Sequence, residues 1–204
     1  MGMSAFTKVN FEKVVRQLYA ENAASILEVY AVKNDDEVEA VATDLAGDRF
    51  IGFSTWRWAT LQEKTGGGQP VYRYMYARPR PGMVASMGDA VAGLAGGVQK
   101  GNGAPKAPPA KGAVHSAEIE YAMGNLNLNK VFAWTADDFK VSKTMQSYFV
   151  NFIKTGNPNG KNLPSWPATK TSKPVPVMRI DVKSEAVKDK TEDRFRVLER
   201  LAKD

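Results

Sequence analysis

The sequence predicts an α/β protein in which a small sheet packs against amphipathic helices. Two segments favour strands: residues 71–76 are aromatic and β-branched and follow a proline, and residues 175–182 carry alternating apolar side chains. The longest run of apolar residues at helical spacing covers about 138–155 and ends at Gly156, with a proline shortly beyond. These segments give the chain both kinds of regular structure.

Three helices are expected near the start of the chain. Apolar residues recur there at helical spacing, and polar residues stand where N-caps are common. Asn10 is a plausible N-cap for the first helix, and Gly47 is expected to end the third. The expected ranges are about 11–19, 22–29 and 38–45.

A fourth helix is predicted over about 49–63. Trp56 and Trp58 could line a binding cleft, but aromatic residues on helices are more often part of the core, and we favour the core for both. We expect Asp48, just before this helix, to make a structural hydrogen bond or ion pair rather than to take part in chemistry.

The strand at 71–76 is expected to belong to the central sheet, and the loop after it leads toward His115. Between them, residues 83–111 form a long connection rich in glycine, alanine, proline and lysine. We predict a flexible insertion loop there, and favour a mobile flap over plain disorder. Residues 83–97 could form a frayed helix.

After the histidine, the helix over about 138–155 is predicted to be capped by Thr135 or Asp137. Residues 193–203 close the chain as an amphipathic helix with Phe195 and Leu198 on its apolar face.

Composition narrows the classes of partner. At 204 residues the chain could bury a sizeable core, and its net charge is +6. The lysines are spread along the chain, with only a loose concentration over 161–190, and no recognition-helix pattern accompanies them. We therefore expect a solvated basic face and no nucleic-acid partner.

The absence of cysteine excludes disulfides and thiolate metal sites. A single histidine would leave carboxylates to bind a metal alone, so no metal and no cofactor are expected. No apolar run approaches the length of a membrane span. No signal peptide is visible, but an absent native N-terminus would explain this equally well, so the compartment stays open, secretion and the periplasm included.

The only histidine lies in the run Gly112-Ala-Val-His115-Ser-Ala-Glu118-Ile-Glu120-Tyr-Ala-Met-Gly124. Histidine suits proton transfer near neutral pH, but one imidazole makes no active site without a nucleophile and an orienting partner. On spacing alone, a structural loop histidine is the commoner case.

This run closely resembles the catalytic-histidine motif of the type-B carboxylesterases, a family that includes para-nitrobenzyl esterases and cholinesterases. The resemblance continues in family order over nearly the whole chain. The other similar segments are Asp48-Arg-Phe50, Trp56-Arg-Trp58, Pro70 to Tyr76, Met145 to Phe152, Thr155 to Gly160 and Leu163 to Pro167.

The resemblance implies that residues 1–204 are the C-terminal portion of an α/β-hydrolase, with the last strands of the central sheet and the surrounding helices. In this fold the triad order is Ser, Asp/Glu, His, and no serine of the chain has glycines at both positions of Gly-x-Ser-x-Gly. We therefore expect the nucleophile and the acid in an N-terminal portion of the same enzyme. The chain by itself is predicted to be inactive toward a small-molecule carboxylic ester.

By motif match, His115 takes the role of the catalytic base. Glu118 could support the histidine loop or a buried polar network, or be an exposed carboxylate. Val114 and Ala117 flank the histidine and could touch substrate, by family analogy only. The alternative function is a cholinesterase-like binding module that lacks catalysis.

Overall fold

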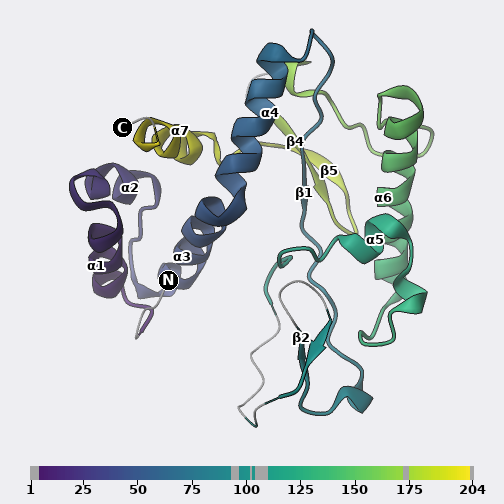
Figure 1. Cartoon of the computed structure of the whole chain (residues 1–204), viewed down its shortest axis with the longest axis horizontal. Helices are drawn as coiled ribbons and strands as arrows, with labels where there is room; N and C mark the ends of the chain where they lie inside the picture. Colours follow the sequence, from purple (N-terminus) through teal and green to yellow (C-terminus); the bar gives the residue numbers. More distant parts are fainter. Residues whose placement is uncertain (1–4, 93–96, 102, 104–109, 172–174, 203–204) are drawn as a thin grey trace. The chain divides into compact units, whose positions relative to one another are not determined.

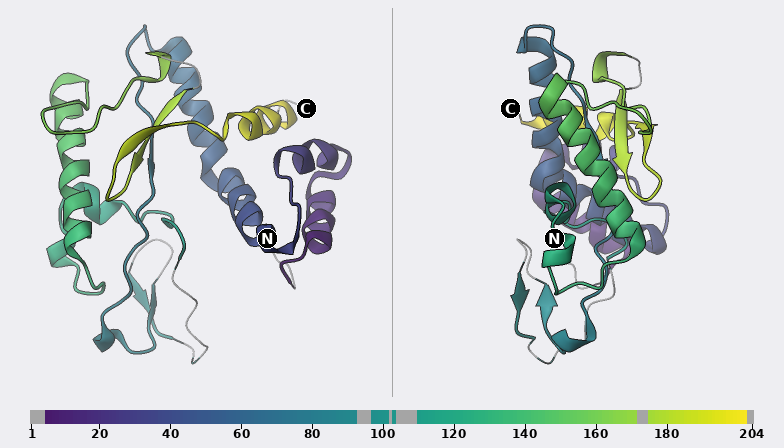
Figure 2. Two further views of the ribbon diagram at one scale, coloured as in Figure 1. Left: turned by 180° about the vertical axis from the view of Figure 1, so that it is seen from behind. Right: turned by 90° about the vertical axis from the view of Figure 1, so that its right-hand side faces the viewer.

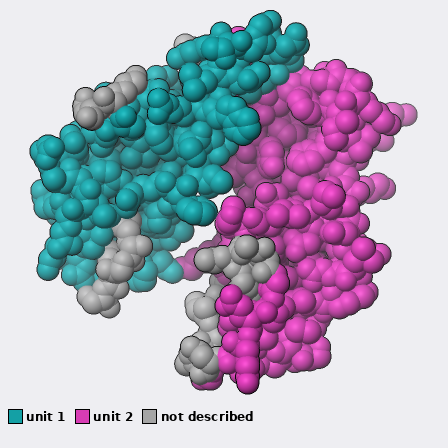
Figure 3. Space-filling model, viewed as in Figure 1, with its two compact units in different colours: residues 1–71, 189–204 teal, residues 72–188 magenta. Residues whose placement is uncertain are grey.

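A computed structural model of the chain describes residues 5–92, 97–101, 103, 110–171 and 175–202. The chain folds into two compact units (Figure 3). The first comprises Met1–Val71 and Asp189–Asp204, and the second comprises Tyr72–Lys188.

The first unit is helical. Its core combines residues from both ends of the chain, among them Phe11, Ile26, Leu45, Trp56 and Phe195. Burial of these side chains holds the C-terminal helix against the N-terminal ones, since apolar area removed from water is the main favourable term in folding. Its α-helices are α1 (Lys8–Tyr19), α2 (Ala23–Val29), α3 (Val38–Gly47), α4 (Phe53–Thr65) and α7 (Glu192–Leu201).

One of two predicted helix ends is wrong, and the other is confirmed. Thr7, not Asn10, is the N-cap of α1, and its hydroxyl accepts a hydrogen bond from the Asn10 backbone N–H at 3.3 Å. Gly47 is the last residue of α3, as predicted, but it keeps right-handed helical dihedrals (φ −65°, ψ −41°), and the chain continues through a π-helical turn, Asp48–Gly52, into α4.

The tryptophan pair of α4 is only half in the core. Trp56 is 5% exposed, stacks on Phe53 and packs at a tilt against Phe195, whereas Trp58 is 74% exposed. The prediction of a core position for Trp58 is therefore wrong. The physical reason is helix geometry: residues two apart point about 200° away from each other, so one of them faces away when the other is buried.

Asp48 has the structural role expected of it. Its carboxylate is buried, accepts a hydrogen bond from the Tyr30 hydroxyl at 2.8 Å and pairs with Arg194 at 3.0 Å. Arg194 also lies over the Tyr30 ring, 5.2 Å from its centroid. This polar cluster ties α2 and α7 to the turn before α4.

The second unit is built on a three-stranded sheet in the order β1-β4-β5. The strands are β1 (Tyr74–Tyr76), β4 (Pro176–Ile180) and β5 (Glu185–Lys188). Strand β1 pairs with β4 in parallel, with Tyr74 opposite Met178, and β4 pairs with β5 in an antiparallel hairpin. The strand predicted at 71–76 is confirmed in its second half, and the one at 175–182 is confirmed as β4.

Two helices of the second unit, α5 (Ile119–Met123) and α6 (Ala136–Thr155), share a core with the sheet (Figures 1 and 2). Helix α6 begins with a capping box formed by Thr135 and Asp138, and Gly156 ends it in the left-handed region (φ 73°). Its predicted range, its cap at Thr135 and its end are confirmed. The core residues are Tyr121, Leu126, Val141, Met145, Tyr148, Trp166, Met178 and Ile180.

The described part of segment 83–111 is not the frayed helix that was considered for residues 83–97. Met83 pairs with Phe132 in an antiparallel bridge, and a single 3₁₀ turn follows (Ala85–Met87). A small antiparallel pair then joins β2 (Val91–Ala92) and β3 (Val98–Gln99). Residues 93–96, 102 and 104–109 lie outside the described residues. The flexibility of 83–111 stays a prediction.

Candidate functional site

The histidine stands on a tight turn between the exit of β1 and helix α5. The Val114 carbonyl accepts a hydrogen bond from the Ala117 N–H at 3.1 Å, so His115 and Ser116 are the two central residues of the turn. Ser116 has a φ of 61°, in the left-handed region that favours glycine. The turn leaves His115 exposed.

The two neighbours of the turn differ in accessibility. Val114 is 44% exposed, so a contact with substrate stays a prediction for it. Ala117 is fully buried in this chain, and its contact with substrate likewise stays a prediction.

Glu118 follows the turn at the start of α5, where its carbonyl accepts a hydrogen bond from the Ala122 N–H at 2.8 Å. Its side chain is half-buried. Burial, and after it the negative charge of Glu118, raises the pKa of Tyr74. Glu118 thus directly follows the histidine turn, and the supporting role considered for it stays a prediction.

A second carboxylate, Glu120, forms an ion pair with Arg80 next to the histidine turn. Its Oε2 accepts a hydrogen bond from Arg80 at 3.0 Å, and its Oε1 accepts one from the Asn129 amide at 3.1 Å. The same Arg80 nitrogen donates to the Ser116 carbonyl at 3.3 Å, directly after the histidine. Arg80 was not among the site residues predicted from the sequence. The available signal was the pair Arg78 and Arg80, just after the strand predicted at 71–76. Their partners lie too far along the chain to be identified from residue spacing.

The other arginine, Arg78, belongs to a buried cluster around Asp138. One carboxylate oxygen of Asp138 accepts hydrogen bonds from Arg78 Nε and the Tyr121 hydroxyl, both at 2.8 Å. The other oxygen accepts from the Thr135 N–H at 2.8 Å and hydroxyl at 2.6 Å. Burial alone would raise the pKa of Asp138, but the donors Arg78, Thr135 and Tyr121 outweigh it and lower the pKa below 3.8. The cluster joins the exit of β1, helix α5 and the start of α6.

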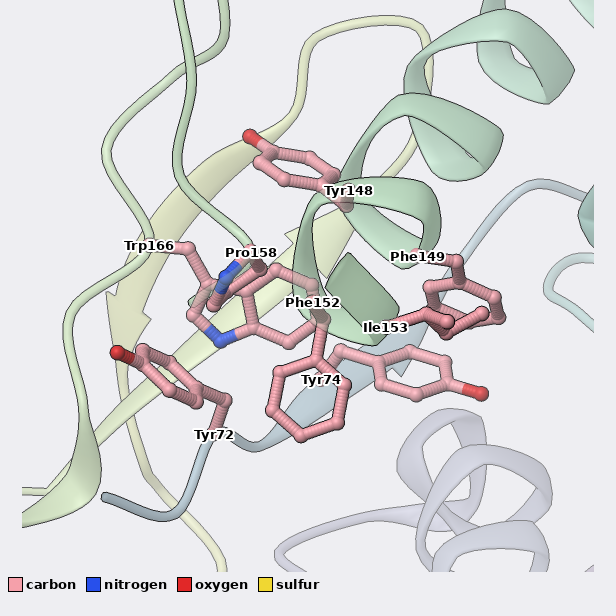
Figure 4. A pocket seen from close by; sticks show the side chains of 8 residues that line it. All are labelled: Tyr72, Tyr74, Tyr148, Phe149, Phe152, Ile153, Pro158 and Trp166. Atoms are coloured by element: carbon pink, nitrogen blue, oxygen red, sulfur yellow. The ribbon is translucent and has the colours of Figure 1, made fainter. Parts of the chain in front are cut away.

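An aromatic groove of about 270 Å³ lies between β1 and the C-terminal half of α6 (Figure 4). Its rings meet edge to face: Tyr74 packs against Phe149 and Trp166 at centroid distances of 5.8 Å each. His115 does not line this groove. The lining residues are Tyr72, Tyr74, Tyr148, Phe149, Phe152, Ile153, Pro158 and Trp166.

Within the described ranges, no group of three or more histidine, cysteine or acidic side chains is arranged to hold a metal ion. No helix in the same part of the chain is both long and apolar enough to cross a membrane.

Comparisons with known proteins relate the chain to the carboxylesterases. A sequence model of the carboxylesterase family matches residues 3–197. Carboxylesterase 4A of Bos taurus is 28% identical over 151 residues, 72% of this chain and 23% of the relative. Pyrethroid hydrolase Ces2e of Rattus norvegicus is 39% identical over 61 residues, 30% of this chain and 11% of the relative.

A solved structure of PNB esterase has a TM-score of 0.54 and 20% identity, with 97% of this chain and 35% of that one covered. Its fold agrees with the observed helices and mixed sheet, which form part of an α/β-hydrolase. The chain thus spans about a third of this structure and at most about a quarter of the relatives named above. Since the family match covers nearly the whole chain, the protein belongs to the type-B carboxylesterase family.

Proposed function

We propose that this chain is the C-terminal part of a carboxylic-ester hydrolase and supplies the histidine of a Ser–Glu/Asp–His triad. The observation that carries the proposal is that the only histidine occupies an exposed turn after the parallel strand β1, in a chain of the carboxylesterase family. An N-terminal portion of the same enzyme provides the serine and the acid.

The chemistry follows from what an imidazole can do. His115 takes the proton of the serine hydroxyl as it attacks the ester carbonyl, and then gives that proton to the departing alcohol. The same group next removes a proton from the water that hydrolyses the acyl-enzyme. Each step needs the ring held within hydrogen-bond reach of the serine oxygen, so the geometry of the histidine turn matters as much as the ring.

The isolated chain is expected to show no turnover of a para-nitrophenyl ester above a His115→Ala control, because its sequence holds no nucleophile elbow. Robust turnover that disappears when a serine of this chain is replaced would contradict the proposal.

Co-expression with the N-terminal portion should produce esterase activity. His115→Ala should then lower kcat by at least about 10²–10⁴-fold, the usual contribution of general-base catalysis. Near-full activity of the His115→Ala variant would refute the assignment of the base.

The second candidate is a cholinesterase-like binding module without catalysis. The exposed aromatic groove favours it, since such surfaces often bind partners. The two candidates differ in one observation: a Gly-x-Ser-x-Gly sequence in the N-terminal portion supports the hydrolase, and its absence supports the module.

A further inference from the structure

We propose that Arg80 is a positioning residue that fixes the histidine turn, so that the ring of His115 is presented in one orientation. The inference rests on the proposed function of His115 as the base. It is carried by a set of contacts between the exit of β1 and the backbone carbonyl directly after the histidine.

The turn itself calls for an external constraint. Ser116 sits at φ 61°, a conformation that non-glycine residues adopt only when their surroundings impose it. One backbone hydrogen bond, from Ala117 N–H to the Val114 carbonyl, closes the turn. Among the backbone hydrogen bonds of the described residues, the Ser116 carbonyl accepts only a long one of 3.5 Å, from the Ile119 N–H. Arg80 adds a charged donor to that carbonyl at 3.3 Å.

Arg80 is itself held from several sides. Its side chain is only 8% exposed and pairs with Glu120, whose side chain is 16% exposed. Its guanidinium lies over the Phe132 ring, 4.8 Å from the centroid. Phe132 belongs to the segment that pairs with the chain after Arg80, through the Met83 bridge and the bond from Ala133 N–H to the Gly82 carbonyl at 2.9 Å.

Glu120 completes these contacts from the helix that follows the turn. It lies in α5 and holds Arg80 with one oxygen and Asn129 with the other. Arg80 is therefore tied to Ser116 and Glu120, which follow His115, although the segment 83–111 separates Arg80 from the histidine along the chain. Because Arg80 reaches a backbone carbonyl rather than the imidazole, it acts through the turn and not on the reacting atoms.

The first test uses the 204-residue chain and hydrogen exchange at the Ala117 amide, which reports opening of the turn. Arg80→Met keeps much of the length of the side chain and removes its donors. It should speed exchange at Ala117 by about tenfold or more relative to the Met145 amide in the core of α6, which reports opening of the whole unit. Arg80→Lys keeps the charge but not the planar guanidinium, so its exchange rate at Ala117 should lie between those of the native chain and Arg80→Met.

Glu120→Gln retains an oxygen for Arg80 and should have a smaller effect than Arg80→Met. The exposed Arg57, in the other unit, provides the matched control, and Arg57→Met should leave the ratio unchanged. The single histidine adds a direct readout: its imidazole resonances should move toward their denatured positions in Arg80→Met and stay in place in Arg57→Met. If Arg80→Met does not fold, Arg80→Lys and Glu120→Gln decide the question.

The second test is kinetic, in the enzyme completed by its N-terminal portion, with para-nitrophenyl butyrate as the probe ester. Active sites are counted by titration with a covalent organophosphate, so that kcat refers to active enzyme only. Arg80→Met should then lower kcat about tenfold with little change in KM, since the turn positions the base rather than the ester.

The two tests separate the inference from the function on which it rests. An unchanged Ala117 to Met145 exchange ratio, or an unchanged kcat in Arg80→Met while His115→Ala is inactive, would overturn the role of Arg80 and leave the proposed function standing. Full activity of His115→Ala would instead remove the proposed function, and with it the catalytic purpose of the contact.

Discussion

The buried carboxylate of Asp138 offers the sharpest test of how the second unit is held together. In Asp138→Asn one oxygen is replaced by an amide that cannot accept a hydrogen bond, so either Thr135 or the pair Arg78 and Tyr121 loses its acceptor. Hydrogen bonds to charged groups contribute about 1.5–3 kcal/mol each, and breaking a buried ion pair costs about 3–5 kcal/mol. We expect the free energy of unfolding of this unit to fall by about 3–5 kcal/mol, a large part of the usual stability of a domain.

The pH dependence has a definite sign. The pKa of Asp138 is lower in the folded chain than its ordinary 3.8, so the unfolded chain takes up the proton first as the pH falls. The stabilisation is therefore complete above 3.8 and is lost as the pH falls through the folded pKa. The difference in stability between the native chain and Asp138→Asn should narrow in that acid range.

Urea unfolding, combined with hydrogen exchange of the α6 amides to isolate the second unit, measures this difference. The exposed neighbour Asp137 is the matched control, because Asp137→Asn removes a charge from the same helical turn and should change stability by less than about 0.5 kcal/mol. Equal losses in the two variants, or a difference for Asp138→Asn that does not vary with pH, would refute the reasoning.

Three further outcomes are expected. Tyr30→Phe removes the buried hydrogen bond to Asp48 and should destabilise the first unit by about 1–2 kcal/mol in urea unfolding; no loss would show that this bond is compensated. Gly124→Ala should lower stability by about 1–2 kcal/mol in thermal unfolding, because φ is +68° and the new Cβ would clash with the Gln146 side chain. An unchanged Tm would contradict this. Limited proteolysis should first cut within residues 83–111, given their composition, and a first cut elsewhere would count against a flexible loop.

Local patterns predicted most of the helices because helix formation depends on neighbours within one or two turns. The spacing of apolar residues located α2 and α7, and the capping and glycine signals located both ends of α6. The same rules failed at Asn10, since Thr7 is the cap of α1, and at the exposed strand β5, which carries no apolar alternation to reveal it.

The sequence by itself determined the family, through motifs in fixed order, and singled out His115 as the residue that could move a proton. Only the tertiary structure decided what holds that residue. Arg80 lies 36 residues from the Ser116 carbonyl and 40 from Glu120, and Arg78 lies 60 from Asp138. No periodicity links side chains at such separations, because their distance in space is set by the pairing of strands and the packing of helices rather than by local backbone preference.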